Sequence, residues 1–287
     1  MEAGSQRRRK RKRGAWWNWL CSPIIHGRYP QTVLYYAVIR RFLIKKDADL
    51  SLRRGAPPLE KYPESIEQPE ECMYKAILFD LDGTLTESGE GITKSVQYAL
   101  EKIGKPEEDL EKLKVFVGPP LLEQFMKYAD LDRDTARQAV VYYRERYAEV
   151  GIYENQVYPG VEKMLKTLKN RGYRLAVASS KPEYFVTKVL DYFHFTDCFD
   201  QIVGSEMNGA RTSKAEVIEE TLKRLGLSAH RQEAVMIGDR EHDILGARAC
   251  GLECVAVSYG YGTAEELQKA EPLKIVDSAD GILDFFA

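Results

Sequence analysis

Two aspartates directly follow a short apolar run. Residues 76–79 are Ala-Ile-Leu-Phe, an unbroken apolar sequence that is typical of a strand buried on both faces of a parallel sheet. Asp80 and Asp82 come next, and because residues two apart in an extended chain point the same way, both carboxylates can aim at one spot. Open α/β sheets bind ligands at the carboxyl ends of their strands, so the pair is placed to act on a ligand. A helix N-cap followed by a turn aspartate is the alternative interpretation.

Two small hydroxyl residues follow a second apolar run. Residues 173–178 predict another buried strand, and Ser179 and Ser180 come after it, ahead of a helix. At such a place a hydroxyl group and backbone N–H groups together can bind a phosphate oxygen. The pair could equally be a plain helix N-cap.

A lysine and two further aspartates complete the set of candidate site residues. Lys214 opens a helix predicted over 215–225, where its charge opposes the helix dipole, a local conflict typical of functional sites. Residues 234–237 predict a strand, and Asp239 and Asp243 follow it one helical turn apart, on a common face. Two such carboxylates suit Mg²⁺, which takes a few carboxylates together with waters and phosphate oxygens. A surface lysine is the alternative for Lys214, and the aspartate spacing by itself is a weak signal.

Further apolar runs supply the elements that position these groups. Short runs predict additional strands, for a sheet of about six in total; they span 201–204, 255–257 and 274–276. Residues 161–170 predict an amphipathic helix. From 87 to 158 the periodicity is helical and no strand is expected. The candidate helices there span 92–103, 121–128 and 135–150.

These residues, in this order, resemble the four motifs of the haloacid dehalogenase (HAD) superfamily. The matching segments are Asp-x-Asp-Gly-Thr at 80–84, Ser179, Lys214, and Gly-Asp-x-x-x-Asp at 238–243. The resemblance covers residues 73–287. It implies an α/β fold with a HAD-like Rossmannoid parallel-sheet core and an inserted helical cap domain. The implied core comprises 73–86 and 159–287, and the implied cap comprises 87–158.

The resemblance also implies a chemical role for single residues. Asp80 would be the nucleophile that takes a phosphoryl group. Asp82 would be the general acid and base, oriented by a hydrogen bond from Thr84. Ser179 would hydrogen-bond the phosphate and Lys214 would balance the negative charge. The phosphate-binding group predicted on this basis is Thr84, Ser179, Ser180 and Lys214.

A magnesium ion is the cofactor that the resemblance implies. Asp80, Asp239 and a backbone carbonyl near Asp82 would hold Mg²⁺, and Asp243 would support the metal shell. The implied reaction is Mg²⁺-dependent hydrolysis of a small phosphorylated metabolite through an aspartyl phosphate. Dehalogenases and phosphonate hydrolases of the superfamily lack an acid at the position of Asp82 and are disfavoured. A sugar phosphomutase keeps both acids and is the nearest enzymatic alternative.

Two segments bear on the substrate. Gly-Asp-Arg-Glu-His-Asp at 238–243 and Gly-Pro-Pro at 118–120 are similar to bacterial 5′-nucleotidase-like and phosphoglycolate-phosphatase-like members. The expected substrate is therefore a nucleoside 5′-monophosphate or 2-phosphoglycolate, with a slight preference for the nucleotide. The segment 116–120 resembles a cap loop that faces the site, but a rigid turn before a helix is an equal alternative.

The first 72 residues differ in character from the rest of the 287-residue chain. They hold 15 Lys and Arg against 8 Asp and Glu, whereas residues 73–287 hold 27 against 36. Residues 7–13 are all basic, tryptophans follow up to position 19, and an apolar stretch over 33–44 predicts a short helix. Residues 7–19 suit an anionic membrane surface or nucleic acid. A solvated tail without a partner, or an upstream start choice ahead of Met73, are the alternatives.

The remaining composition indicates a reduced, cytoplasmic protein. Five cysteines without a Cys-x-x-Cys pair argue against a disulfide framework or a zinc site. Cys250 and Cys254 are expected to be packing residues. No run reaches the apolar length of a membrane span, and no secretory signal is recognised. From a different class of function, the chain could be a membrane- or nucleic-acid-tethered module whose enzyme body is not essential. Residues 55–71, rich in proline, predict an extended linker between the two parts.

Overall fold

The structure is a computed structural model that describes residues 74–287. The predicted basic run over 7–13, the short helix over 33–44 and the linker over 55–71 lie outside the described residues. The fold is α/β, as expected. Within the described part of the chain, no helix is both long enough and apolar enough to cross a membrane.

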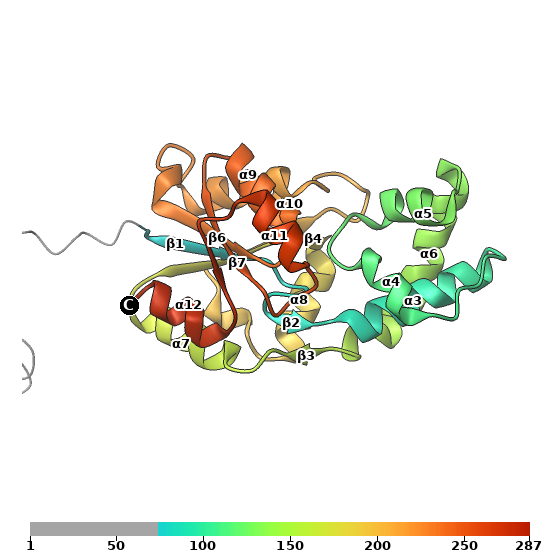
Figure 1. The fold of residues 1–287 in the computed structure, drawn as a ribbon, viewed down its shortest axis with the longest axis horizontal. Coiled ribbons are helices and arrows are strands. Elements are labelled where there is room, and N and C mark those ends of the chain that lie inside the picture. The colour runs from blue at the N-terminus through green and yellow to red at the C-terminus, as the bar shows by residue number, and fades with distance from the viewer. Residues whose placement is uncertain (1–73) are drawn as a thin grey trace, which may run out of the picture. The chain divides into compact units, whose positions relative to one another are not determined.

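A six-stranded parallel sheet forms the core (Figure 1). Its strand order is β5-β4-β1-β6-β7-β8, and β1 pairs with β4 on one side and β6 on the other. The strands are β1 (Ala76–Phe79), β4 (Arg174–Pro182), β5 (Gln201–Ser205), β6 (Ala234–Gly238), β7 (Glu253–Val257) and β8 (Lys274–Val276). The apolar run of β1 is fully buried because helices cover both faces of the sheet.

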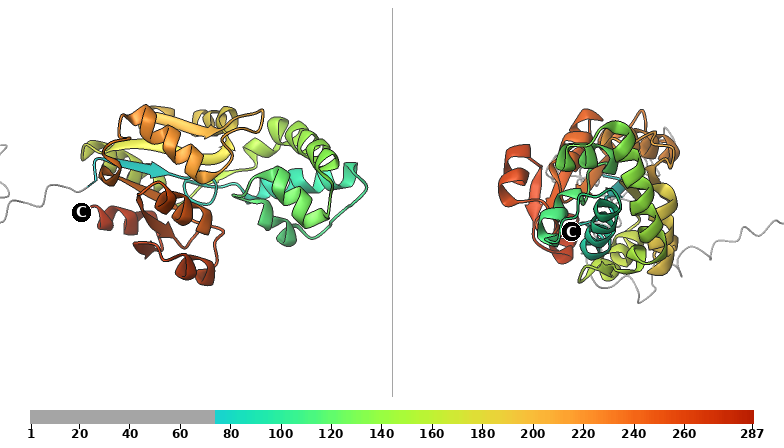
Figure 2. Two further views of the ribbon diagram at one scale, coloured as in Figure 1. Left: turned by 90° about the horizontal axis from the view of Figure 1, so that it is seen from above. Right: turned by 90° about the vertical axis from the view of Figure 1, so that its right-hand side faces the viewer.

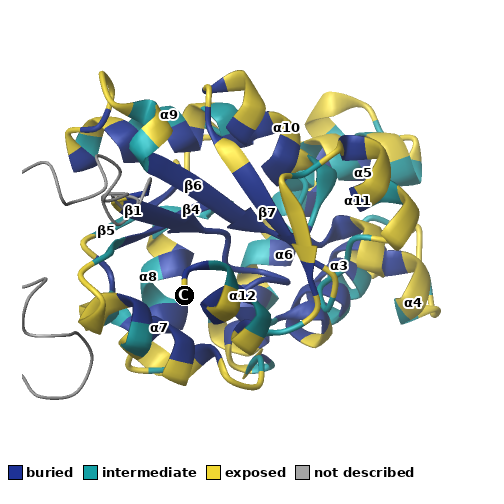
Figure 3. Cartoon of the chain, turned by 60° about the vertical axis from the view of Figure 1, so that its left-hand side comes forward, coloured by how far each residue is buried: buried dark blue, intermediate teal, exposed yellow. Residues whose placement is uncertain are grey.

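Helices pack on both faces of this sheet, as Figure 3 shows. Alternate residues of β1 face opposite layers: Ile77 and Phe79 pack with one apolar cluster, and Ala76 and Leu78 with the other. One layer contains α7 (Val161–Asn170), α8 (Glu183–Tyr192) and α12 (Ala279–Phe285). The other contains α9 (Lys214–Leu225), α10 (Glu241–Ala249) and α11 (Ala264–Ala270). Cys250 and Cys254 are buried in this second cluster, as packing residues would be.

A helical insertion interrupts the chain between β1 and α7. It contains α3 (Gly89–Lys102), α4 (Leu110–Leu113), η5 (Lys114–Phe116), α5 (Leu121–Ala129), α6 (Arg133–Glu149) and η6 (Gly151–Tyr153). Figure 2 shows these helices beyond the carboxyl ends of the strands rather than over either face of the sheet. The three long helices match the expected ones to within a few residues. The limits of the predicted core and cap domains stay predictions.

Two short strands lie at the ends of the insertion, and the expectation of no strand from 87 to 158 was wrong. β2 (Thr86–Glu87) pairs antiparallel with β3 (Gln156–Val157), so the outgoing and returning chains run side by side. Each strand has two residues, too few for an alternating pattern to show in the sequence. Their pairing joins residues about 70 positions apart, so tertiary structure rather than local propensity produces them.

Candidate active site

The predicted site residues meet at the carboxyl ends of the three central strands. Asp80 and Asp82 follow β1, Ser179 lies within β4, and Asp239 follows β6. β4 is longer than expected, so Ser179 belongs to the strand rather than to a loop after it. Lys214 reaches the same place from the first residue of α9. Because β4 and β6 flank β1 in parallel, three chain segments far apart in sequence deliver their polar side chains to one edge of the sheet.

A sharp turn after β1 brings Asp82 and Thr84 back toward the site. Gly83 has φ of +87°, a conformation that residues with a side chain rarely adopt. A Cβ atom at this position would lie 2.1 Å from Oδ2 of Asp239. Glycine therefore allows both the turn and the close approach of the Asp239 carboxylate to the backbone.

Lys214 lies between two of the aspartates. Its Nζ is 3.0 Å from Oδ1 of Asp80 and 2.8 Å from Oδ1 of Asp243, and it donates a hydrogen bond to the Ala178 carbonyl at 3.0 Å. Burial lowers the pKa of the Lys214 ammonium. The charges of Asp243 and Asp80 and their hydrogen bonds together raise this pKa by more, so the net shift is upward. The ammonium therefore stays charged and holds two carboxylates in place.

Three carboxylates form a compact buried cluster. Oxygen atoms of Asp80, Asp239 and Asp243 lie within 4.8 Å of one another. Burial raises the pKa of Asp80 to about 6 against the opposing effect of Lys214. Burial, then the charges of Asp243 and Asp80, raises the pKa of Asp239 well above its usual range. Burial and the mutual repulsion of the carboxylates therefore both disfavour the ionised forms of Asp80 and Asp239.

This cluster fits a divalent cation. Carboxylate oxygens are the ligands that hard cations prefer, and a buried cation would relieve the mutual repulsion of the three aspartates. Backbone groups hold two of them in fixed orientations, since Tyr261 N–H donates to Asp239 Oδ2 at 2.7 Å and Arg240 N–H donates to Asp243 Oδ2 at 3.1 Å. Asp239 and Asp243 were expected on one face of a helix, but Asp239 precedes α10 and only Asp243 lies within it. The loop between β6 and α10, together with the start of α10, brings the two carboxylates together.

Asp82 lies apart from this cluster and has a partner that sequence reasoning missed. Its two carboxylate oxygens accept hydrogen bonds from Lys181 Nζ at 3.0 and 2.8 Å. The expected hydrogen bond from Thr84 to Asp82 was wrong: Thr84 Oγ1 donates to Asp239 Oδ1 at 3.4 Å. The signal for Lys181 was its place directly after Ser179 and Ser180, at the end of a central strand.

The two serines occupy different places. Ser179 is buried, and its hydrogen bond to the Asp80 carboxylate lowers the pKa of that group against the larger effect of burial. Ser180 is half-buried and lines an open cleft. The structure thus brings Ser179 to Asp80 and leaves Ser180 facing the cleft.

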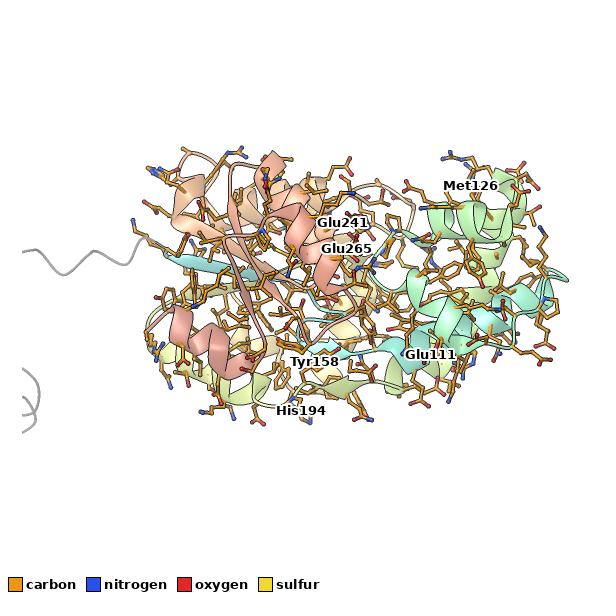
Figure 4. The ribbon with its side chains drawn as sticks, in the orientation of Figure 1. Glu111, Met126, Tyr158, His194, Glu241 and Glu265 are labelled. Carbon is orange, nitrogen blue, oxygen red and sulfur yellow. The ribbon has the colours of Figure 1, made fainter. Side chains whose placement is uncertain are left out.

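A cleft of about 940 Å³ lies between the helical insertion and the core. Ser180 and Lys214 line it from the core, and Gly118, Pro119 and Pro120 line it from the insertion. The loop before α5 therefore faces the same space as two of the candidate site residues. Figure 4 shows Glu241, another residue of this cleft, on the side of the core nearer the insertion helix that carries Met126.

Comparisons with known proteins agree with this arrangement. A family model described as "Haloacid dehalogenase-like hydrolase" matches residues 77–257. A 5′-nucleotidase from Pseudomonas aeruginosa is 47% identical over 199 residues, which are 69% of this chain and 89% of the relative. A tyrosine-protein kinase, PtkA, from Mycobacterium tuberculosis is 37% identical over 203 residues, covering 71% of this chain and 68% of the relative.

Two further similarities concern phosphatases. A phosphoglycolate phosphatase from Pseudomonas savastanoi is 30% identical over 210 residues, covering 71% of this chain and 76% of the relative. The crystal structure of a predicted phosphatase from Clostridium acetobutylicum superposes with a TM-score of 0.72 at 45% identity, covering 74% of this chain and 98% of that chain. Residues 1–72 of this chain lie outside the family match.

Proposed function

This chain belongs to the haloacid dehalogenase-like hydrolase family and is a phosphatase, and we propose that it hydrolyses nucleoside 5′-monophosphates with Mg²⁺ through an aspartyl phosphate on Asp80. The family resemblance stated on the sequence motifs is confirmed. The nucleotide is favoured over 2-phosphoglycolate because the 5′-nucleotidase relative is more similar than the phosphoglycolate phosphatase.

The observation that carries this proposal is the separation of two aspartates, two residues apart, into different environments. Asp80 contacts Lys214 and lies in the carboxylate cluster, whereas Asp82 contacts Lys181 and lies outside it. Such a separation suits two different tasks, nucleophilic attack by one carboxylate and proton transfer by the other.

The proposed first step is attack of an Asp80 oxygen on the phosphorus atom. Lys214 and the backbone N–H of Leu81, 2.7 Å from Asp80 Oδ1, hold the carboxylate in a fixed orientation. As the ester bond breaks, Asp82 gives a proton to the departing oxygen, and it then takes a proton from the water that cleaves the aspartyl phosphate. Ser179, Ser180 and Lys214 bind phosphate oxygens, and Thr84 orients Asp239, so that its part in phosphate binding is indirect.

Mg²⁺ is the proposed cation, with Asp80, Asp239 and Asp243 and the Asp82 backbone carbonyl as its protein ligands. When bound, it would offset the charge of the phosphate and of the nucleophile, which otherwise repel each other.

Two further sequence-based expectations stay predictions. They are a cytoplasmic location of the protein and binding of residues 7–19 to an anionic membrane or to nucleic acid.

The test is phosphate release from nucleoside 5′-monophosphates, 2-phosphoglycolate and sugar phosphates, with and without Mg²⁺. We expect release to require Mg²⁺ and to be lost in Asp80→Asn, which keeps the shape of the side chain but is not a nucleophile. Asp134→Asn is the matched control, because this side chain is 89% exposed on the insertion. Phosphate release that survives in Asp80→Asn would refute the proposed nucleophile.

Two outcomes would favour other reactions of the same site. Interconversion of sugar phosphates with slow phosphate release would indicate a phosphomutase. Transfer of phosphate from ATP to tyrosine, included because of the PtkA relative, would indicate a kinase. Absence of phosphate release from every substrate, with the protein folded, would refute the proposed reaction and favour either a phosphomutase or the N-terminal segment, acting as a tether, as the functional part.

A further inference from the structure

Lys181 joins the proposed acid/base residue to the helical insertion. Its Nζ contacts both carboxylate oxygens of Asp82, and both side chains are only 7% exposed. The same ammonium lies 4.6 Å from the centre of the Tyr147 ring. Tyr147 belongs to α6 of the insertion, whereas Lys181 belongs to β4 of the core. The contact between Lys181 and Tyr147 therefore joins the core to the helical insertion next to the site.

Aromatic packing restrains this lysine. Tyr147 is 1% exposed, stacks on Tyr143 with ring centres 5.2 Å apart, and packs edge-on against Phe185 at 5.4 Å. An ammonium over an aromatic face is attracted to it, and the attraction is stronger when water is excluded. Lys181 thus contacts both the Asp82 carboxylate and a buried group of packed rings.

We propose that Lys181 is a positioning residue that aims Asp82 at the leaving-group oxygen, and that α6 secures it there through Tyr147. This inference rests on the proposed function of the same site. The proton that reaches the leaving oxygen comes from Asp82, and Lys181 transfers none. While one Asp82 oxygen carries that proton, the other keeps its hydrogen bond to the ammonium.

A purely structural ion pair is the competing explanation, and the two differ in their dependence on the leaving group. An alkoxide, such as the ribose oxygen of a nucleoside 5′-monophosphate, needs a proton as it departs. The phenolate of p-nitrophenyl phosphate departs readily without one. Loss of a correctly aimed acid therefore slows the first substrate more than the second, whereas a structural defect slows both alike.

The experiment compares kcat/KM for these two substrates, because kcat/KM reports steps only as far as departure of the alcohol. We expect Lys181→Met to lower kcat/KM about 100-fold for the nucleotide and less than about fivefold for p-nitrophenyl phosphate. Lys188→Met is the matched control, since Lys188 Nζ also lies over a tyrosine ring, 4.9 Å from the centre of Tyr184, but that ring is exposed. Equal losses on the two substrates, or no loss, would overturn the inference.

Two further variants make the result independent of a single substitution. If Lys181 acts through Asp82, adding Lys181→Met to Asp82→Asn should cost nothing more, and an additional loss would contradict this. Tyr147→Leu removes the ring and should reproduce the selective loss on the nucleotide, even if Lys181→Met does not fold.

The proposed function and this inference fail in different ways. If the wild-type protein releases phosphate from neither substrate, the proposed function is wrong, and Asp82 has no leaving group to protonate. If the wild type is active but the lysine variant shows uniform losses, only the role of Lys181 is wrong.

Discussion

Arg240 Nη1 donates a hydrogen bond to the Val117 carbonyl at 2.8 Å, across the cleft between core and insertion. Arg240 lies between Asp239 and Asp243 in sequence, and its own N–H donates to the Asp243 carboxylate. A single residue therefore contacts both the carboxylate cluster and the loop that faces it. Its Nε also binds Glu266 of α11 at 2.8 Å, which fixes the guanidinium.

We predict that Arg240→Met lowers kcat/KM about tenfold, because hydrogen bonds from a charged group contribute about 1.5–3 kcal/mol each. Losing the contact would let the insertion open more often and admit water to the site. The measurement is steady-state kinetics at saturating Mg²⁺.

Glu266→Gln is the control for this prediction. It removes the ion pair that holds Arg240 but leaves the contact with Val117 available. A loss as large as that of Arg240→Met would mean that orientation of the turn, and not the contact with the insertion, determines activity.

Lys214→Met should abolish activity and destabilise the fold. Removing the ammonium leaves Asp80 and Asp243 buried with no positive charge between them, and breaking a buried ion pair costs about 3–5 kcal/mol. Chemical unfolding and phosphate release measure the two effects. Lys223→Met, on the same helix but 75% exposed, should change neither. An active Lys214→Met variant would exclude the lysine from phosphate binding.

Gly83→Ala tests the close approach of the Asp239 carboxylate to the turn. Gly83 and Gly104 have similar positive φ angles, +87° and +76°, but a Cβ at Gly104 meets no atom within 4 Å. Both variants should lose about 1 kcal/mol through backbone strain. Gly83→Ala should in addition displace Asp239 and lose the rise in melting temperature that Mg²⁺ gives the wild type.

Comparing Gly83→Ala with Gly104→Ala separates the effect of backbone strain from the effect of a Cβ that overlaps the Asp239 carboxylate. Should Gly104→Ala also lose the Mg²⁺ response, the effect would come from general destabilisation. Should Gly83→Ala keep it, Asp239 would not be a ligand of the cation.

The parallel sheet was predictable because each central strand contains a run of four apolar residues, and a polar residue follows that run directly or one position later. Asp80, Ser179 and Asp239 each follow or end such a run, and parallel pairing brings them together. Lys214 was predictable from a local conflict with its helix. In each case a local pattern carried the information.

Contacts that depend on which side chains meet across the fold were not predictable. The partner of Thr84 is 155 positions away in sequence, and the partner of Lys181 is 99 positions away. The sequence around Thr84 gives no reason to choose Asp239 rather than Asp82 as the acceptor of its hydrogen bond. The two-residue strands β2 and β3 belong to the same class, since only their pairing defines them.

The acid stability of the insertion should depend on Glu154. Its carboxylate accepts hydrogen bonds from Arg146 at 2.8 and 3.1 Å and from Lys94 at 3.2 Å, joining α6 and α3. The hydrogen bonds from Arg146 are the main cause that lowers the pKa of Glu154 below its ordinary value of 4.5. The unfolded chain therefore binds this proton at a higher pH than the folded protein does.

It follows that Glu154 stabilises the fold fully above about pH 4.5 and that this contribution falls as the pH drops below that value. Glu154→Gln should cost about 1 kcal/mol at pH 7 and less at pH 3.5, so its unfolding free energy should vary less steeply with pH than that of the wild type. Urea unfolding between pH 3.5 and 7 measures this. Glu162→Gln is the control, because Glu162 and Lys166 form an exposed pair on α7 that solvent screens. Equal pH dependence in the wild type and in Glu154→Gln would show that the three-residue contact contributes nothing to acid stability.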